Sequence, residues 1–597
     1  MIEVYRNILS LFDARERGRF WLLAAVMVVV AVAEVVGIST VLLLLKVLAA
    51  PAIITENATL AWCYQTFEFR STFAFQVALS AAVFATVLGS LIIKALGTYA
   101  ITRFSTMRGY TISCRLLESY LHKPYAWFLD HNSADVGKNV LSEVDGLVQR
   151  VIVPGLKLMS NMLVVIGIVG FLVYVDPVVS FLAAGFLGGS YAFIYVKMRD
   201  RLRHAGEQMY DAIGQRFVIA TEATGGIKDV KLLGLEDDYV RRFAIFAKQS
   251  AHNGARMQLM SELPRFALEA ITFGTLLGLV MVLLLRSGGD IAAIIPTLGI
   301  FAFAVMRLLP SLQQTYQGLA SIRGARTALD SILRDYRLVE VPVPVTASAE
   351  PLTLDRALEL SGVGYRYRSA DRTTLSGLDL TIAARTTVGL VGGTGAGKTT
   401  LVDLILGLLS PDEGEIRVDG TAVTASNLRS WQKMLGYVPQ SIYLTDDTVA
   451  ANIAFGVPAD QIDHAAVERA ARAAALHDFV VAELAKGYDT IVGERGIRLS
   501  GGQRQRIGIA RALYRQPTLL IMDEATSALD TITERVVMEA VQNIRSDTTI
   551  ILIAHRLSTV KTCDRIFLME KGRVVAAGTY DELVKDSATF RKMATGG

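Results

Sequence analysis

The stretch with the clearest capacity for chemistry is a glycine-rich loop, "GGTGAGKTT" at 392–400, which follows a β-branched run and precedes "LVDLILGLL". A strand, a GxxxxGK[ST] loop and a helix in this order are the context in which such a loop binds phosphates. Glycines let the backbone curl until several amide N–H groups point at one anion. Lys398 can neutralise the β and γ phosphates of a nucleotide, and the Thr399 hydroxyl can ligate Mg²⁺. The predicted nucleotide contacts are Gly392, Gly393, Thr394, Gly395, Ala396, Gly397, Lys398, Thr399 and Thr400.

A second stretch, "PTLLIMDEATSALD" at 517–530, places two acidic residues at the end of an apolar run. The run predicts a buried strand, and Asp523 at its end is placed to hold Mg²⁺ through water. Glu524 follows directly, where a carboxylate can polarise the water that attacks a γ-phosphate. An acidic turn after a strand is common by itself, but its position downstream of the phosphate loop favours a catalytic role.

A third stretch, "IRLSGGQRQRIGIARAL" at 497–513, presents a hydroxyl and bare backbone amides at the start of a predicted helix. Such a helix start is an anion site. A chain with a complete phosphate loop needs no second anion site for its own nucleotide, so we expect this one to face the nucleotide of a partner chain. Its predicted contacts are Ser500, Gly501, Gly502 and Gln503.

The LSGGQ sequence, in company with the other two motifs, resembles the signature of ATP-binding-cassette (ABC) proteins. The resemblance implies that Tyr367 stacks on adenine, that Gln440 joins Thr399 and Asp523 at Mg²⁺, and that His555 contacts the γ-phosphate. It also implies that Glu494 faces the membrane domain and that residues 527–530 form the D-loop. With Glu524 and His555 both present, we expect a motor that hydrolyses ATP.

One membrane part followed by one motor resembles an ABC half-transporter. Each ATP would then lie between the phosphate loop of one chain and Ser500 of the other, so the resemblance implies a dimer. A single complete motif set favours a homodimer with two competent sites. The resemblance also places coupling helices near residues 128–138 and 222–231 of the two long cytoplasmic loops.

The composition predicts a membrane protein with a soluble part, because 52% of the 597 residues are hydrophobic and only 19% are charged. Six stretches are long enough to cross a bilayer. These stretches predict a polytopic α-helical membrane domain with six transmembrane helices, followed by an α/β P-loop domain. The resemblance implies that the former is of ABC exporter type and that the latter is an ATP-binding cassette domain. The predicted domains are 1–338 and 357–597, joined by a linker at 339–356. The predicted spans are 20–48, 73–100, 157–175, 178–198, 264–285 and 291–316.

Basic residues cluster on one side of these spans, before the first and after the second and fourth. The positive-inside rule then puts the N-terminus, both long loops and the motor in the cytoplasm. Three scattered cysteines exclude a disulfide framework and a cysteine metal cluster. The net charge of +4 is small and sits at the membrane flank, so it predicts anchoring and no nucleic-acid partner.

Three cations in the membrane part, Lys94, Arg265 and Arg307, fall at similar depth near the inner leaflet boundary. They come from three helices, so one hypothesis is that they converge on an anionic substrate. The alternative is that each snorkels to the interface. Glu34 and Glu269 are also buried in apolar spans, and a structural ion pair with an arginine is at least as plausible for them as substrate contact.

The membrane half resembles bacterial lipid-linked oligosaccharide flippases of the protein-glycosylation pathway, through "EVVGIST", "LPRFALEA", "RLLPS" and a predicted outer-loop helix at 57–69. That resemblance implies a polyprenyl-pyrophosphate-linked glycan moved across a bacterial inner membrane, with Arg265 and Arg307 binding the pyrophosphate. The outer-loop helix would either grip a lipid tail or cover the spans. The alternative function is a multidrug, lipid or peptide exporter.

Overall fold

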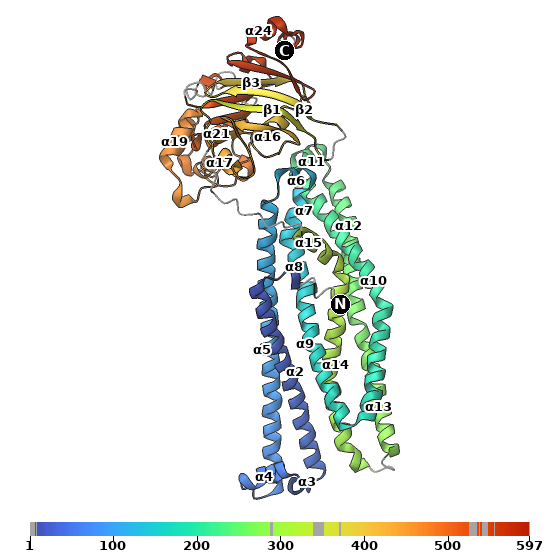
Figure 1. The fold of residues 1–597 in the computed structure, drawn as a ribbon. Helices are drawn as coiled ribbons and strands as arrows, with labels where there is room; N and C mark the ends of the chain where they lie inside the picture. Colours follow the sequence, from blue (N-terminus) through green and yellow to red (C-terminus); the bar gives the residue numbers. More distant parts are fainter. Residues whose placement is uncertain are drawn as a thin grey trace. The chain divides into compact units, whose positions relative to one another are not determined.

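The computed structural model describes residues 6, 9–286, 291–337, 352–368, 372–524, 534–536, 538–539, 547–554 and 556–595. The chain forms two compact units, one helical and one built around β-sheets (Figure 1). The first comprises Met1–Lys123 and His131–Val341, and the second comprises Pro124–Asp130 and Pro342–Gly597. Most of the predicted linker lies outside the described residues, so the domain boundaries stay a prediction.

The helical unit consists of long helices joined by short turns. Its α-helices are α2 Ala14–Ala49, α3 Ile53–Glu56, α4 Ala58–Thr66, α5 Thr72–Leu121, α7 Ser133–Lys138, α8 Val144–Leu147, α9 Val153–Val175, α10 Pro177–Gly225, α11 Ile227–Leu233, α12 Glu236–Glu262, α13 Pro264–Arg286, α14 Ile291–Gly324 and α15 Arg326–Arg337. Two π-helical segments, η1 Asn139–Glu143 and η2 Val148–Ile152, flank α8.

Five stretches of helix within the described residues are long and apolar enough to cross a membrane: Ala14–Ala49, Thr72–Leu121, Val136–Val175, Pro177–Gly225 and Glu236–Val282. They contain the first four predicted spans and residues 264–282 of the fifth. The sixth predicted span falls in α14, whose first six side chains lie outside the described ones. Helix α14 runs through Pro310 without a break in its helical assignment.

The turn between the third and fourth spans shows how sequence determines a hairpin here. Helix α9 ends at Val175, and α10 begins at Pro177. Proline lacks a backbone N–H, but the first N–H of a helix has no acceptor within the helix, so no hydrogen bond is lost. The side chain of Asp176 caps α10 by accepting a hydrogen bond from the Val179 amide at 3.1 Å. The pair "DP" at 176–177 is thus the sequence pattern that forms this tight hairpin.

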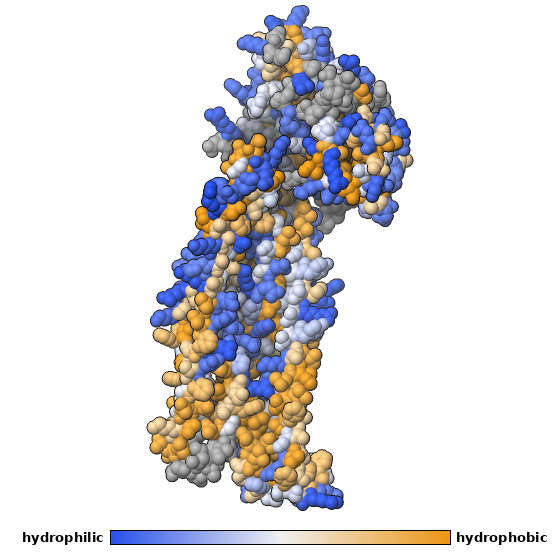
Figure 2. All heavy atoms as spheres, turned by 180° about the vertical axis from the view of Figure 1, so that it is seen from behind, coloured by the Kyte–Doolittle hydropathy of each residue, from blue (hydrophilic) through white to orange (hydrophobic). Residues whose placement is uncertain are grey.

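The surface of the helical unit changes character along its length. Hydrophobic side chains gather over the lower part, where Figure 1 places α3, α4 and α13, and hydrophilic ones over its upper part (Figure 2). The helices therefore continue well beyond the apolar band, as expected for helices that project from a membrane into water.

The predicted outer-loop helix is present as α4, with Asn57 as its N-cap. Leu60 is buried against Val47 and Phe75. Phe67, seven residues after Leu60, is 69% exposed because it lies just beyond the last turn. This packing favours the hypothesis that α4 covers the ends of the first two spans.

The second unit contains two sheets. Its strands are β1 Ala357–Tyr365, β2 Leu375–Ala383, β3 Thr387–Gly392, β4 Glu413–Val418, β5 Thr421–Ala422, β6 Leu435–Val438, β7 Leu519–Asp523, β8 Thr549–Ile553, β9 Arg565–Glu570 and β10 Arg573–Gly578. Its helical segments are α6 Tyr125–Asp130, α16 Lys398–Ile405, α17 Leu428–Lys433, α18 Val449–Ile453, α19 His464–Ala473, α20 His477–Glu483, α21 Gly501–Tyr514, α23 Leu557–Val560, α24 Tyr580–Asp586 and α25 Ala588–Thr595, with short 3₁₀ turns η3 Ala459–Gln461, η4 Gly487–Asp489 and η5 Glu494–Gly496.

Sheet topology explains why the motifs meet. One sheet has the order β2-β1-β4-β5, and the other has the order β10-β9-β3-β8-β7-β6. Strands β3, β8 and β7 are parallel neighbours, so their carboxyl ends share one edge. The phosphate loop leaves β3 and Glu524 follows β7, at that same edge. Ligands of open α/β sheets bind at such an edge.

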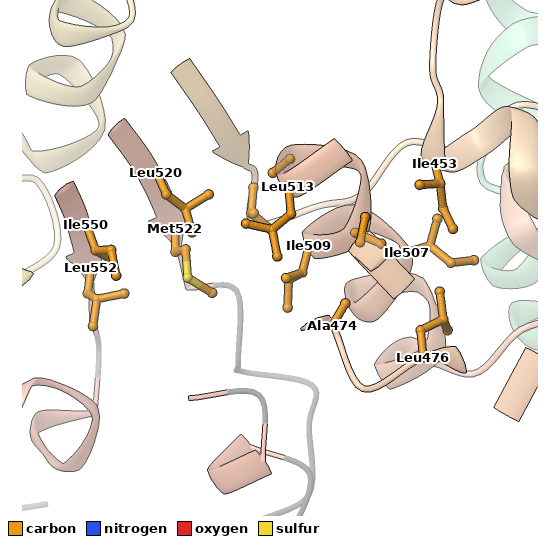
Figure 3. Packing of buried hydrophobic residues seen from close by; sticks show 14 of the residues in the cluster. Ile453, Ala474, Leu476, Ile507, Ile509, Leu513, Leu520, Met522, Ile550 and Leu552 are labelled. Carbon is orange, nitrogen blue, oxygen red and sulfur yellow. The ribbon is translucent and has the colours of Figure 1, made fainter. Parts of the chain in front are cut away.

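The hydrophobic core fixes the helix that carries the LSGGQ motif. Ile507, Ile509 and Leu513 of α21 are buried and belong to one cluster with Leu520 and Met522 of β7 (Figure 3). Helix α21 is thereby held against the strand that ends in the candidate catalytic carboxylates, within the same unit.

Candidate functional site

The phosphate loop has a backbone that requires glycine at specific positions. Gly395 and Gly397 have φ angles of +78° and +98°, in the region that favours glycine. A Cβ on Gly392 would lie 2.3 Å from the carbonyl oxygen of Met569, so no side chain fits there. At Gly393 and Gly395, by contrast, an added Cβ would meet open space. The loop therefore curls around a volume that is free for phosphate oxygens.

Lys398 lies inside this loop. Its ammonium donates hydrogen bonds to the carbonyl oxygens of Gly392 and Gly393, at 2.7 and 3.3 Å. Burial lowers the pKa of Lys398, while the charges of Glu524 and Asp523 act in the opposite direction. A buried cation held by loop carbonyls is placed to receive a phosphate as its anionic partner.

Residues from two different motifs meet at the sheet edge. The side-chain amide of Gln440 donates to a carboxylate oxygen of Glu524 at 2.8 Å. Glu524 itself has a φ of +48°, a left-handed conformation that is costly for a residue with a side chain. The preceding Asp523 is buried at the end of β7. The backbone strain therefore occurs at the predicted catalytic carboxylate.

The predicted adenine-stacking residue is tied to the phosphate loop. The Tyr367 hydroxyl lies 3.0 Å from the Thr400 hydroxyl oxygen, and Tyr367 packs edge-on against Tyr365. Thr400 is buried, whereas Thr399 is exposed at the start of α16. The hydroxyl of Thr400 thus holds Tyr367, and Thr399 remains the candidate for the metal.

The LSGGQ segment begins α21 as predicted. Ser500 is its N-cap and forms a capping box, in which its hydroxyl accepts from the Gln503 amide and Gln503 accepts from the Ser500 amide. Within the described residues, no hydrogen bond joins Ser500 to the phosphate loop. Gly501 and Gly502 are partly exposed. His555 and residues 525–530 lie outside the described residues.

The fit for Mg²⁺ rests on Thr399, Asp523 and Gln440. No group of three or more His, Cys, Asp or Glu side chains within the described residues is arranged to hold a metal. Mg²⁺ in nucleotide sites takes one or two protein oxygens and completes its shell with phosphates and water. The exposed Thr399 hydroxyl and the Asp523 carboxylate fit that kind of site.

The five charged residues predicted in the apolar spans, Glu34, Lys94, Arg265, Glu269 and Arg307, form two separate groups. Glu34 on α2 is 2% exposed and lies 3.3 Å from the Arg307 guanidinium of α14 and 2.9 Å from the Lys94 ammonium of α5. Arg307 donates a hydrogen bond to Glu34 and also lies over the Phe303 ring. The Lys94 ammonium forms an ion pair with Oε1 of Glu34, but the angle between the groups does not make it a hydrogen bond. Two of the three predicted cations thus converge, and they converge on Glu34.

Arg265 does not join this cluster. Its guanidinium donates to Glu269 at 2.7 Å, one turn later on α13, and its side chain is 52% exposed. Of the three cations predicted to converge, only Lys94 and Arg307 lie together, at Glu34. An i,i+4 pair on one helix surface has a local partner and needs no other.

A cavity of about 840 Å³ lies inside the helical unit, between α5, α9, α10, α12 and α14. Lys94 lines it, together with Arg150 and Lys157, which the sequence analysis missed. Residues 150 and 157 are seven apart, but only Lys157 falls within the predicted third span, 157–175. Asn161 donates to Gln314 at 3.0 Å across this cavity wall.

Comparison with known proteins decides the family. Residues 22–308 match the family described as ABC transporter transmembrane region, and residues 375–527 match the family described as ABC transporter. The protein named ATP-dependent lipid A-core flippase of Cupriavidus metallidurans is 33% identical over 478 residues, 80% of each chain. The protein of the same name from Chromohalobacter salexigens is 30% identical over 504 residues, 83% of this chain and 84% of that one.

A solved structure of a bacterial Atm1-family ABC exporter with ATP bound is also similar. The match covers 98% of this chain and 99% of that chain, with a TM-score of 0.78 and 26% sequence identity. This chain is an ABC exporter half-transporter. Its predicted fold class is confirmed, and so is a motor that couples ATP hydrolysis to translocation.

The first predicted coupling segment, 128–138, overlaps helix α6, which packs within the ATP-binding unit. Helix α6 belongs to the second unit, although both segments that flank it belong to the first. Ala126 packs against the hydrophobic cluster that includes β1 and α16. Burial raises the pKa of Tyr125, and the charge of Asp403 adds to that effect. Helix α6 begins at Tyr125, three residues before the start predicted for this coupling segment.

Asp403, in α16 of the exporter, gives a pH-dependent prediction. Burial raises its pKa from 3.8 to about 6, and the nearby Asp523 charge adds to the shift. The folded protein then binds this proton more tightly than the unfolded chain, so stability falls as pH rises from about 4 to about 6. Above that range the ionised carboxylate costs on the order of 2–3 kcal/mol.

Asp403→Asn is therefore expected to raise the unfolding temperature of the ATP-binding unit at pH 7.5, and to raise it less at pH 5. Thermal unfolding of the full exporter in detergent at both pH values measures the difference. Asp460→Asn, a change at an exposed carboxylate, is the matched control. Equal gains for Asp403→Asn at both pH values would contradict the assigned pKa.

Proposed function

We propose that this exporter is a homodimer that flips an anionic glycolipid across the inner membrane of a bacterium, with its N-terminus and ATP-binding unit in the cytoplasm. The leading candidate cargo is a polyprenyl-pyrophosphate-linked oligosaccharide. Lys94 and Arg307 are the proposed contacts for its phosphates, and Arg265, already paired with Glu269, is left out.

The observation that carries this proposal is the unbalanced charge around Glu34. Two cations share one buried carboxylate, so the cluster keeps a net positive charge inside the membrane part. Unpaired charge in that environment costs several kcal/mol, and function is the usual reason that it persists. Because Lys94 also lines the cavity, a phosphate that enters the cavity supplies the missing negative charge.

The proposed motor chemistry follows from the sheet edge. ATP would be held by the phosphate loop and Lys398, with Mg²⁺ on Thr399 and Asp523. Glu524, positioned by Gln440, would polarise the attacking water. His555 and the Ser500 segment of the partner would complete the site. One complete motif set supports two equivalent sites in a homodimer.

A second candidate cargo is a lipid A-core glycolipid, because the two relatives described above carry that name. It shares with the first candidate a phosphate-bearing headgroup on long acyl or isoprenoid chains. An exporter of drugs or peptides is the alternative from the same family, and the unpaired positive charge beside the cavity argues against neutral or cationic cargo.

The proposal predicts which compounds stimulate ATP hydrolysis. In proteoliposomes, a pyrophosphate-linked or lipid A-type glycolipid is expected to raise the ATPase rate of the exporter at least about twofold. Cationic drugs and neutral peptides are expected to leave the rate at its basal value, since they add no negative charge to the cavity. Stimulation by drugs or peptides with none by either glycolipid would overturn the proposal.

A further inference from the structure

We infer that Arg511 is a positioning residue that links the segment 440–448 to α21, the helix that begins after Ser500. Through this link, the state of one ATP site reaches the residues that face the nucleotide of the partner chain. The inference rests on the proposed homodimer and extends it, because it concerns communication between the two ATP sites.

The segment 440–448 lies directly on α21. Ile442 approaches this helix so closely that a Cβ on Gly508 would lie 2.5 Å from the Cδ1 methyl carbon of Ile442. Three residues further along the helix, the Arg511 guanidinium donates to the carbonyl oxygen of Tyr443 at 2.7 Å. Residues three apart share a helix face, so two successive residues of the segment are docked on one face of α21.

The same guanidinium also binds Asn452 of α18. It donates to the carbonyl oxygen of Asn452 at 2.8 Å and to its side-chain oxygen at 3.2 Å. Asn452 is fully buried, and its side chain holds the turn before α18: it accepts from the Thr445 amide at 3.0 Å and donates to the Thr448 carbonyl oxygen at 3.1 Å. Arg511 and Asn452 together therefore fix residues 443–448.

Arg511 carries a charge that no carboxylate balances within the described part of the chain. Its hydrogen bonds go to neutral oxygens, and its guanidinium lies 4.7 Å from the centroid of the Phe455 ring. Burial lowers the pKa of Arg511. An apolar side chain would avoid the cost of desolvating a charge. Only the rigid fork of a guanidinium, with five N–H donors, holds two separate segments at once.

The two ends of this link belong to two different ATP sites of the proposed dimer. At one end, Gln440 donates to Glu524 beside the phosphate loop of its own chain, at 2.8 Å. At the other end, Ser500 caps α21 and is proposed to face the nucleotide of the partner chain. Small shifts of packed helices pass a change from one site to another. A γ-phosphate that draws Gln440 thus acts on Ser500 through Arg511.

A second arginine of α21 makes the same type of bond to a different part of the unit. Arg506 donates to the carbonyl oxygen of Ala475 at 2.7 Å, and its guanidinium lies 5.7 Å from the centroid of the Phe479 ring. Ala475 lies between α19 and α20 and is not part of the segment 440–448. Arg506 is therefore the matched control for a bond that only supports the fold.

The test measures the ATPase rate of the full exporter in proteoliposomes as a function of ATP concentration. In Arg511→Met, the half-saturating ATP concentration is expected to rise about tenfold, because charge-assisted hydrogen bonds are lost. The Hill coefficient is expected to fall from above about 1.5 to about 1, because the two ATP sites become independent. The kcat should stay within about threefold of wild type, since Glu524 and Lys398 are unchanged.

Two further variants separate positioning from stability. Arg511→Lys keeps the charge but not the fork, so it should raise the half-saturating concentration about threefold; it replaces Arg511→Met if that variant does not fold. Arg506→Met should lower the unfolding temperature as Arg511→Met does, yet leave the Hill coefficient and the half-saturating concentration at their wild-type values. Thermal unfolding in detergent measures the stability of each variant.

A double-mutant cycle locates the path. Gln440→Ala and Arg511→Met interrupt the same link, so the double variant should resemble the more severe of the two single variants in its half-saturating ATP concentration. Additive effects would show that Arg511 does not act through Gln440.

The inference is overturned by wild-type ATP dependence in folded Arg511 variants, by an equal change in Arg506→Met, or by additivity in the cycle. A wild-type Hill coefficient of about 1 would overturn it as well, because the sites would then be independent already. If ATP produces no crosslink between two copies of the wild type, the proposed homodimer itself fails, which is a different result.

Discussion

Replacing Glu524 by glutamine is expected to lower ATP turnover at least about 100-fold, because the group that polarises the attacking water is lost. Glutamine keeps the shape of the side chain and can still contact Gln440, whose amide lies 2.8 Å from the Glu524 carboxylate in the structure. ATP binding and ATP-dependent closure of the proposed dimer should therefore survive. ATPase rates and a crosslink between the two ATP-binding units measure the two effects separately.

Lys398→Ala is the matched control for that experiment, since Lys398 is placed to bind the phosphates themselves. It should abolish both turnover and ATP-dependent closure. Normal ATPase rates in Glu524→Gln would remove Glu524 from the catalytic role, and its strained backbone would then need another explanation.

Arg307→Ala is expected to lower glycolipid flipping at least about tenfold while leaving the basal ATPase rate within about twofold of wild type. The substitution removes one of the two cations on Glu34, but the ion pair between Glu34 and Lys94 remains. No carboxylate is left buried without a partner, so the fold should tolerate the change. Flipping is measured in proteoliposomes, and folding is measured by thermal unfolding.

Two further variants separate cargo binding from structural support. Arg265→Ala removes a cation of the same type from a partly exposed pair on one helix and should flip normally. Glu34→Ala leaves Lys94 and Arg307 without their carboxylate and should lower the unfolding temperature. Wild-type flipping by a folded Arg307→Ala variant would show that Arg307 serves Glu34 alone.

Features that depend on neighbouring residues could be predicted from the sequence. The phosphate loop, the Asp176 hairpin and the helix start at Ser500 each depend on a few adjacent positions with fixed conformational preferences. The structure shows each of them where the pattern placed it. The strand that ends at Asp523 belongs to this group as well.

Features that depend on distant residues could not be predicted in the same way. Glu34 and Arg307 are 273 positions apart, and only helix packing shows that Lys94 reaches the same carboxylate. Arg150 escaped notice because it precedes the predicted third span, 157–175, and only helix packing shows that it lines the cavity. The inclusion of α6 in the ATP-binding unit likewise depends on tertiary packing.

The most direct test of the account is the ATP-dependent flipping of a phosphorylated glycolipid by the wild-type exporter in proteoliposomes, beside the same lipid with its phosphates removed. The account predicts that ATP drives the phosphorylated lipid across the membrane at least about tenfold faster than the neutral one, because only the former engages Lys94 and Arg307. Equal rates for the two lipids, or flipping that does not depend on ATP, would contradict it.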